Sequence, residues 1–384
     1  MKQTPINLLA DYGQAFWYDN IDRSMLSNGV LENLIKQDDL KGITSNPAIF
    51  EKAITNSNDY DQALALLIRE QPNASNRELF FDLAVEDIQN AADQLKPVYA
   101  QSQGGDGYVS LEVSPDLAYD TQASIKEARE LFLRLGRPNI MIKIPATKEG
   151  IPAIEQLIAD GVNINATLLF SVERYEAVAN AYINGIKQRY EKGMPLKNIS
   201  SVASFFISRV DGAMDSALQQ MIENGNTEQQ NIAQSLLGKV AILNAKSSYK
   251  RYIELFGENF VRYVEAGANP QRLLWASTGV KNPNYSDTLY IDELIGPNTV
   301  NTIPPATLSA FKDHGSARPS LERGLDQVDE QINQLNKLNL ATDDIMSTLE
   351  KDGVALFAKA FDNLLIAITE KTNAIKKQQK SNVA

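Results

Sequence analysis

Short β-like runs alternate with longer stretches of helical periodicity along most of this chain, and this alternation limits its fold more than any other feature. Such βα alternation is typical of a parallel sheet flanked by helices. Strands are predicted over residues 16–21, 42–45, 108–114, 139–144, 162–170, 201–207, 273–277 and 300–303. Helical patterns long enough to connect parallel strands are predicted over residues 125–135, 151–158, 173–190 and 232–256.

Eight strands joined by crossover helices predict an α/β fold, a (β/α)8 TIM barrel. The main rival is a doubly wound open sheet, but the glycine-rich turn of a dinucleotide fold is missing after the first strand. After Gly315 the pattern becomes wholly helical, over residues 321–338 and 345–375, which adds C-terminal helices to the barrel. We therefore expect residues 1–384 to form a single barrel domain, with a helical appendage over residues 316–375 and a flexible tail over residues 376–384.

The composition is that of an ordinary globular protein, with 43% hydrophobic and 22% charged residues. A formal net charge of -11 argues against general binding to nucleic acid or to an acidic membrane, because both surfaces repel an acidic protein. The chain has no cysteine, no apolar run long enough to span a membrane, and no signal-peptide core at its amino terminus. We expect a cytoplasmic protein without nucleic-acid or membrane partners, and the sequence is compatible with a homo-oligomer.

Polar residues recur on one face of several predicted strands. Side chains alternate between the two faces of a strand, and in a barrel one set points to the central axis. In residues 140–144 the three isoleucines share one face, which leaves Lys143 and Met141 on the axial face. An antiparallel sheet with one solvent-exposed face could produce this pattern. Crossover helices argue against it, because they join parallel strands, which are usually covered on both faces. The polar residues that this sorting places on axial faces include Asp19, Glu112, Lys143, Asn165, Thr167 and Ser204.

Lys143 is the most informative of these residues. A lysine inside a β run is uncommon, because an ammonium buried without a partner is costly and tends to lose its proton. The free amine can attack a carbonyl and form an imine, whose protonated form is an electron sink that lets a nearby carbon–carbon bond break. The alternative is a strand-end lysine that reaches water or pairs with a carboxylate. The neighbouring carboxylates, amides and hydroxyls favour a retro-aldol site, which needs these groups for proton transfer and sugar binding.

Six segments in sequence order closely resemble the transaldolase family, in particular its longer bacterial subgroup. They begin with Phe-Trp-Tyr-Asp-Asn-Ile over residues 16–21 and include Ile-Met-Ile-Lys-Ile-Pro-Ala-Thr over residues 140–147. The other four segments cover residues 42–50, 109–113, 163–171 and 275–282. The resemblance therefore extends through nearly the whole barrel.

The resemblance implies the catalytic roles. Lys143 corresponds to the imine-forming lysine, and Asp19 to the acid/base that takes the proton of the C4 hydroxyl during cleavage. Glu112, through a water held with Thr167, corresponds to the proton shuttle of imine formation. No metal and no other cofactor is implied, because the iminium replaces the metal ion of other aldolases. The single histidine, His314, also rules out a cluster of histidine ligands.

The resemblance also implies a binding site for sugar phosphates. The hydroxyls of a dihydroxyacetone unit would be held by Asn46, Asn165 and Ser204. The substrate phosphate would be held by Arg209, Ser277 and Lys281, although shorter members carry an arginine where this chain has Lys281, and lysine lacks the two-pronged hydrogen bonding of arginine.

The implied reaction belongs to the pentose phosphate pathway. A dihydroxyacetone unit would pass from sedoheptulose 7-phosphate or fructose 6-phosphate to glyceraldehyde 3-phosphate or erythrose 4-phosphate, through a Schiff base on the lysine. One rival is a fructose 6-phosphate aldolase, which releases dihydroxyacetone to water and has a tyrosine where this chain has Phe206. The phenylalanine therefore favours transfer. A rival of another class is a catalytically inactive barrel that binds sugar phosphates as a sensor or scaffold.

Overall fold

A computed structural model describes residues 4–381 and confirms the predicted (β/α)8 TIM barrel. The eight strands form one closed parallel sheet in sequence order, and pairing of the first strand with the last completes the barrel. The strands are β1 Gln14–Tyr18, β2 Gly42–Ile43, β3 Tyr108–Glu112, β4 Ile140–Pro145, β5 Ile164–Leu169, β6 Ser201–Phe206, β7 Arg272–Ala276 and β8 Thr299–Ile303.

Helices surround the sheet and bury its outer face. The α-helices are α1 Arg23–Ser27, α2 Val30–Gln37, α3 Pro47–Thr55, α4 Asp61–Glu70, α5 Asn76–Gln101, α6 Thr121–Leu135, α7 Gly150–Asp160, α8 Val172–Glu191, α9 Ser208–Asn224, α10 Thr227–Leu236, α11 Val240–Leu255, α12 Val261–Glu265, α13 Leu289–Glu293, α14 Pro305–His314, α15 Val328–Lys337 and α16 Thr342–Ser381. Short 3-10 turns lie at Pro5–Leu8, Ala10–Tyr12, Pro115–Leu117, Glu258–Phe260 and Leu325–Gln327.

The strand register brings the predicted axial residues together. Glu112 on β3 lies opposite Lys143 on β4, and Lys143 lies opposite Asn165 on β5. The isoleucines of β4 are fully buried on the other face, as their alternation with Lys143 predicts. The carboxyl ends of parallel strands meet at one end of a barrel, so these three polar side chains share its upper part.

Strand β5 contains an irregularity near its carboxyl end. The register between β5 and β6 shifts between Ala166 and Leu169, and Leu168 has a φ of 61°, a left-handed conformation that is strained for leucine. At this irregularity the Leu168 side chain lies against α16. A Cβ built on Gly353 of that helix would lie 3.0 Å from Leu168 Cδ2. The irregularity therefore brings α16 close to the barrel mouth.

The helix predicted over residues 232–256 is wrong as a single element. It is divided between α10 and α11, because Gly238 between them has a φ of +68° and a Cβ there would come within 2.7 Å of the Tyr285 ring. Only glycine combines that backbone conformation with so close an approach. The break turns the chain back toward the loop that follows β7.

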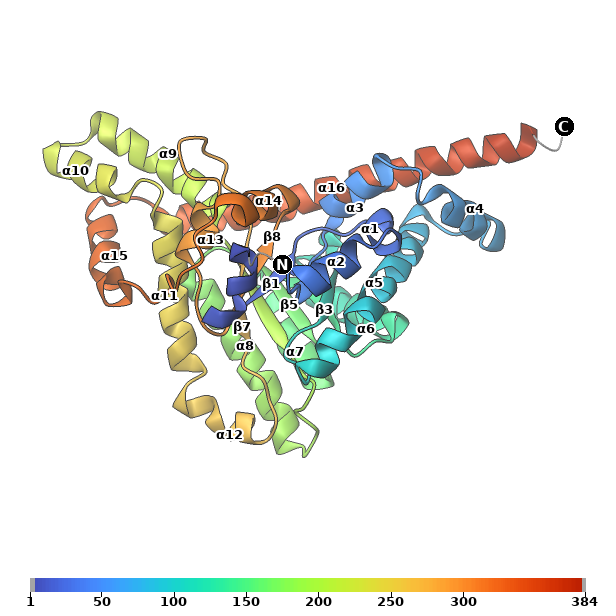
Figure 1. The fold of residues 1–384 in the computed structure, drawn as a ribbon, viewed down its shortest axis with the longest axis horizontal. Helices are drawn as coiled ribbons and strands as arrows, with labels where there is room; N and C mark the ends of the chain where they lie inside the picture. Colours follow the sequence, from blue (N-terminus) through green and yellow to red (C-terminus); the bar gives the residue numbers. More distant parts are fainter. Residues whose placement is uncertain (1–3, 382–384) are drawn as a thin grey trace.

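The C-terminal part is helical, with different bounds from those predicted. The helix expected over residues 321–338 begins only at Val328, after an irregular segment and a 3-10 turn. The long helix α16 packs on α3, α4 and α9 and extends beyond α4 (Figure 1). Residues 376–381 of the predicted tail continue α16, and residues 382–384 lie outside the described residues. No helix within residues 4–381 has both the length and the apolar character that crossing a membrane requires.

Candidate active site

A cavity of about 150 Å³ opens at the carboxyl ends of the strands, where active sites of TIM barrels lie. Most of the predicted site residues line it, namely Asp19, Asn46, Lys143, Thr167, Ser204, Phe206, Arg209, Ser277 and Lys281. The two others, Glu112 and Asn165, lie behind its wall and contact residues that line it. The structure therefore brings the whole predicted set together.

Lys143 and Glu112 form a buried ion pair. Lys143 Nζ lies 3.4 Å from Glu112 Oε2 and donates a hydrogen bond to the backbone carbonyl of Ser45 at 3.0 Å. Burial raises the pKa of the Glu112 carboxyl, and the Lys143 charge opposes this rise. Both Glu112 carboxyl oxygens and Thr167 Oγ1 are buried without a hydrogen-bond partner among the described residues. Such groups are expected to bind water or substrate.

Asp19 follows β1 and faces the same cavity from the opposite side of the barrel. Its Oδ1 accepts a hydrogen bond of 2.7 Å from Thr44 Oγ1, which also lies 2.6 Å from Thr302 Oγ1. Burial raises the pKa of Asp19, whereas the hydrogen bond from Thr44 and the charge of Lys143 lower it. Asp19 is therefore a carboxyl with a raised pKa, as expected of a group that exchanges protons with a substrate.

Amides and hydroxyls form a connected network beside Lys143. Ser204 Oγ donates to Asn165 Oδ1 at 2.6 Å, and Asn165 Nδ2 donates to Ser110 Oγ at 3.1 Å. The network holds the Asn165 amide in one orientation and leaves Ser204 at the cavity wall. Asn46 is the N-cap of α3, where its Oδ1 accepts from the Ile49 backbone N–H at 3.0 Å. Its Nδ2 donor remains for a ligand.

Two cations stand at the outer end of the cavity. Arg209 lies in the first turn of α9, a helix terminus that favours anions, and Lys281 lies on the loop after β7. Neither residue forms an ion pair with a carboxylate of the described chain. Burial lowers the pKa of Arg209, whose guanidinium faces the Phe206 ring at 5.3 Å. Ser277, whose Oγ lies 2.8 Å from Ser208 Oγ, completes an arrangement suited to phosphate.

Six further residues that line the cavity were not predicted as site residues: Thr44, Ala276, Gly279, Thr302, Pro304 and Phe357. The alternation of β2 carried a signal for Thr44, which lies two positions beyond Gly42 and therefore shares its axial face. On β8 the same alternation places Thr302 on the same face as Val300. Phe357 comes from α16, and no local pattern marks one apolar residue of a long helix as part of a distant cavity. Among residues 4–381, no group of three or more His, Asp or Glu side chains is arranged to hold a metal ion.

Comparisons with known proteins agree with this geometry. The model of the family described as transaldolase/fructose-6-phosphate aldolase matches residues 16–368. A protein named Transaldolase 2 from a Nostoc species is 42% identical over 374 residues, which cover 96% of this chain and 97% of the relative.

Two further relatives are similar along nearly their whole length. A transaldolase from Thermobifida fusca is 44% identical over 374 residues, covering 97% of this chain and 99% of the relative. A transaldolase from Thiobacillus denitrificans is 43% identical over 357 residues, covering 93% and 97%. The chain therefore belongs to the transaldolase/fructose-6-phosphate aldolase family, and it is an enzyme with transaldolase function.

Proposed function

We propose that Lys143 forms a Schiff base with a ketose phosphate and carries a dihydroxyacetone unit to an aldose phosphate. The donors would be sedoheptulose 7-phosphate or fructose 6-phosphate, and the acceptors glyceraldehyde 3-phosphate or erythrose 4-phosphate. The observation that carries this proposal is the buried Lys143 amine, which lies at one cavity with two carboxyls of raised pKa. At the outer end of that cavity are two cations that form no ion pair with any described carboxylate.

Glu112 serves the steps that make and break the imine. The amine of Lys143 attacks the C2 carbonyl, and the resulting carbinolamine must lose water before an iminium forms. Glu112 lies 3.4 Å from the amine, and with Thr167 it offers buried oxygens that can hold a water and pass a proton to the carbinolamine hydroxyl, which then leaves as water. The iminium supplies the electron sink of the reaction, so the proposed mechanism has no metal step.

Asp19 serves the cleavage step. As a carboxylate it removes the proton of the C4 hydroxyl, the C3–C4 bond breaks, and its electron pair passes to the iminium to leave an enamine. The aldose phosphate departs from the end of the cavity near Arg209 and Lys281, whose charges suit its phosphate. The acceptor enters at the same end, the enamine carbon attacks its carbonyl, and Asp19 returns the proton to the new alkoxide.

Phe206 supports transfer over release to water. Its ring lines the cavity and packs on Phe170 at 5.2 Å, so this part of the wall carries no hydroxyl that could orient a water. A fructose 6-phosphate aldolase is the second candidate, since the family model covers both activities. Phe206→Tyr is expected to raise the ratio of dihydroxyacetone release to transfer, and an unchanged ratio would contradict this role of Phe206.

Borohydride trapping tests the Schiff base directly. Reduction in the presence of fructose 6-phosphate should increase the mass of the peptide that contains Lys143. Lys143→Met should abolish the adduct, whereas Lys148→Met, an exposed lysine just beyond β4, should keep it. An adduct at no lysine would refute the imine mechanism and would favour a barrel that only binds sugar phosphates.

The remaining expectations concern organisation and location. We expect the chain to work as a single domain in the cytoplasm, because α16 joins the barrel wall and the proposed substrates are metabolites of that compartment. Cell fractionation tests the location, and a single cooperative transition in calorimetry tests the domain organisation.

A further inference from the structure

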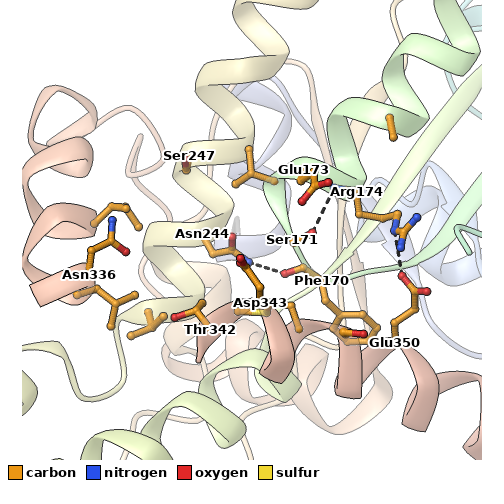
Figure 2. A pocket seen from close by; sticks show the side chains of 17 residues that line it. Phe170, Ser171, Glu173, Arg174, Asn244, Ser247, Asn336, Thr342, Asp343 and Glu350 are labelled. Carbon is orange, nitrogen blue, oxygen red and sulfur yellow. Dashed lines mark hydrogen bonds and ion pairs between the residues drawn. The ribbon is translucent and has the colours of Figure 1, made fainter. Parts of the chain in front are cut away.

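Helix α16 runs from α8 across the mouth of the barrel, and one of its faces contacts the barrel at successive turns. Glu350 forms an ion pair of 3.0 Å with Arg174 at the start of α8, beside a pocket of about 390 Å³ between α8, α11, α15 and α16 (Figure 2). Gly353, one turn further, lies against Leu168 and Phe170. Phe357, one turn beyond Gly353, enters the catalytic cavity. The spacing of three and four residues keeps all of these on one helix face.

Gly353 fixes how close the helix lies. A glycine inside a helix is less favourable than alanine by about 1 kcal/mol, so it is expected where contact requires it. Here a Cβ would lie 3.0 Å from Leu168 Cδ2 and 3.5 Å from the Phe170 ring. Phe170 in turn packs on Phe206 and accepts a hydrogen bond from Asn244 through its carbonyl (Figure 2). The contacts of Gly353 with Leu168 and Phe170 therefore help to fix where α16 places Phe357.

The Phe357 ring lies between the two ends of the proposed substrate site. Its centroid is 5.8 Å from Lys143 Nζ and 6.0 Å from Arg209 Cζ, and the residue is 6% exposed. A carbon bonded to nitrogen lies about 1.5 Å from it, and apolar atoms make contact at about 4 Å. The gap between Nζ and the ring therefore suits one layer of carbon atoms attached to the lysine.

We propose that Phe357 is a specificity-determining residue that favours transfer over release by shielding the three-carbon fragment on Lys143 from water. This inference rests on the proposed Schiff-base function. With Phe206 on the neighbouring wall, the ring forms an apolar cover over the enamine, and α16 supplies it from outside the barrel strands.

The chemistry defines what the cover prevents. Release requires that the enamine carbon take a proton from water, which regenerates an iminium. A water then adds to the imine carbon, the C–N bond breaks, and dihydroxyacetone leaves with the Lys143 amine restored. Transfer uses the same enamine carbon to form a carbon–carbon bond with an aldehyde. An apolar ring against the fragment slows the first route, because it keeps water away from the carbon, and leaves the aldehyde route open toward Arg209.

The partition between the two routes tests the inference. Dihydroxyacetone release from fructose 6-phosphate and transfer to erythrose 4-phosphate are measured for wild type, Phe357→Ala and Phe357→Leu. We expect Phe357→Ala to raise the ratio of release to transfer about fivefold, which corresponds to about 1 kcal/mol between the two barriers. Phe357→Leu should have a smaller increase. Leu356→Ala is the matched control, since Leu356 precedes Phe357 on the same helix but is 52% exposed.

The outcomes separate this inference from the proposed function. Absence of a borohydride adduct in the wild type would refute the Schiff base itself. If all variants form the adduct on Lys143 and Phe357→Ala leaves the ratio of release to transfer unchanged, the role of Phe357 is refuted while the Schiff base stands. An equal increase of this ratio in Leu356→Ala would refute the role of Phe357 as well. Circular dichroism identifies a variant that does not fold. If Phe357→Ala does not fold, the test rests on Phe357→Leu. An unchanged ratio of release to transfer in that variant would overturn the inference.

Discussion

Replacement of Thr44 by valine should move the pH dependence of transfer without a change of shape in the site. Thr44 Oγ1 donates the hydrogen bond of 2.7 Å to Asp19 Oδ1, and this bond lowers the pKa of Asp19 against the opposing effect of burial. Hydrogen bonds to charged groups contribute about 1.5–3 kcal/mol, and valine has nearly the shape of threonine. Thr44→Val therefore leaves the carboxylate less stable, so Asp19 holds its proton to higher pH.

The assay is the pH dependence of kcat for transfer from fructose 6-phosphate to erythrose 4-phosphate. Because Asp19 must be ionised to start cleavage, the acid limb should move upward by about one to two pH units in Thr44→Val. Thr278→Val is the matched control, since Thr278 is also buried and its Oγ1 donates to the Thr302 carbonyl and not to Asp19. An acid limb that stays in place in Thr44→Val, or moves equally in Thr278→Val, would refute the proposed coupling.

Glu112→Gln should lower kcat about 10²- to 10⁴-fold and slow adduct formation, whereas Glu191→Gln on the surface should not. Arg209→Ala should raise KM for sugar phosphates more than Lys281→Ala, because Arg209 is the less exposed cation; equal effects in phosphate-free assays would contradict this. Transfer should survive EDTA treatment, and its loss would contradict the metal-free mechanism. Burial raises the pKa of Asp211 to about 6, so the folded state holds that proton more tightly. Its contribution to the free energy of unfolding should be about 1.4 kcal/mol larger at pH 5 than at pH 7.5 and absent in Asp211→Asn, as urea denaturation can measure.

The barrel could be predicted because its signal is local. Each strand is a short apolar run between helical patterns, and the alternation within β4 is enough to direct Lys143 inward. The segments predicted as strands all overlap strands of the structure. The prediction of a single helix over residues 232–256 failed because the break depends on Gly238, which has a positive φ and lies close to the Tyr285 ring from a segment distant in the sequence.

The site could be predicted as a set of residues but not as a set of contacts. The hydrogen bond from Thr44 to Asp19 depends on how β1, β2 and β8 align, and the short strand β2 leaves little in the local sequence to fix that alignment. The place of Phe357 in the cavity could not be predicted from the sequence for a similar reason. Helix α16 has apolar residues along most of its length, and only its crossing of the barrel decides which turn meets Lys143.

The position of Phe357 late in the chain has a consequence for biosynthesis. A ribosome completes all eight strands, with Lys143, before it adds α16, and nascent domains generally fold as their residues emerge. A barrel at that stage would hold the reactive amine under an open mouth. If Phe357 controls the fate of the bound fragment, an enzyme still on the ribosome would cleave ketose phosphates and release dihydroxyacetone more readily than it would transfer the fragment. Efficient transfer would begin only when the last helix docks.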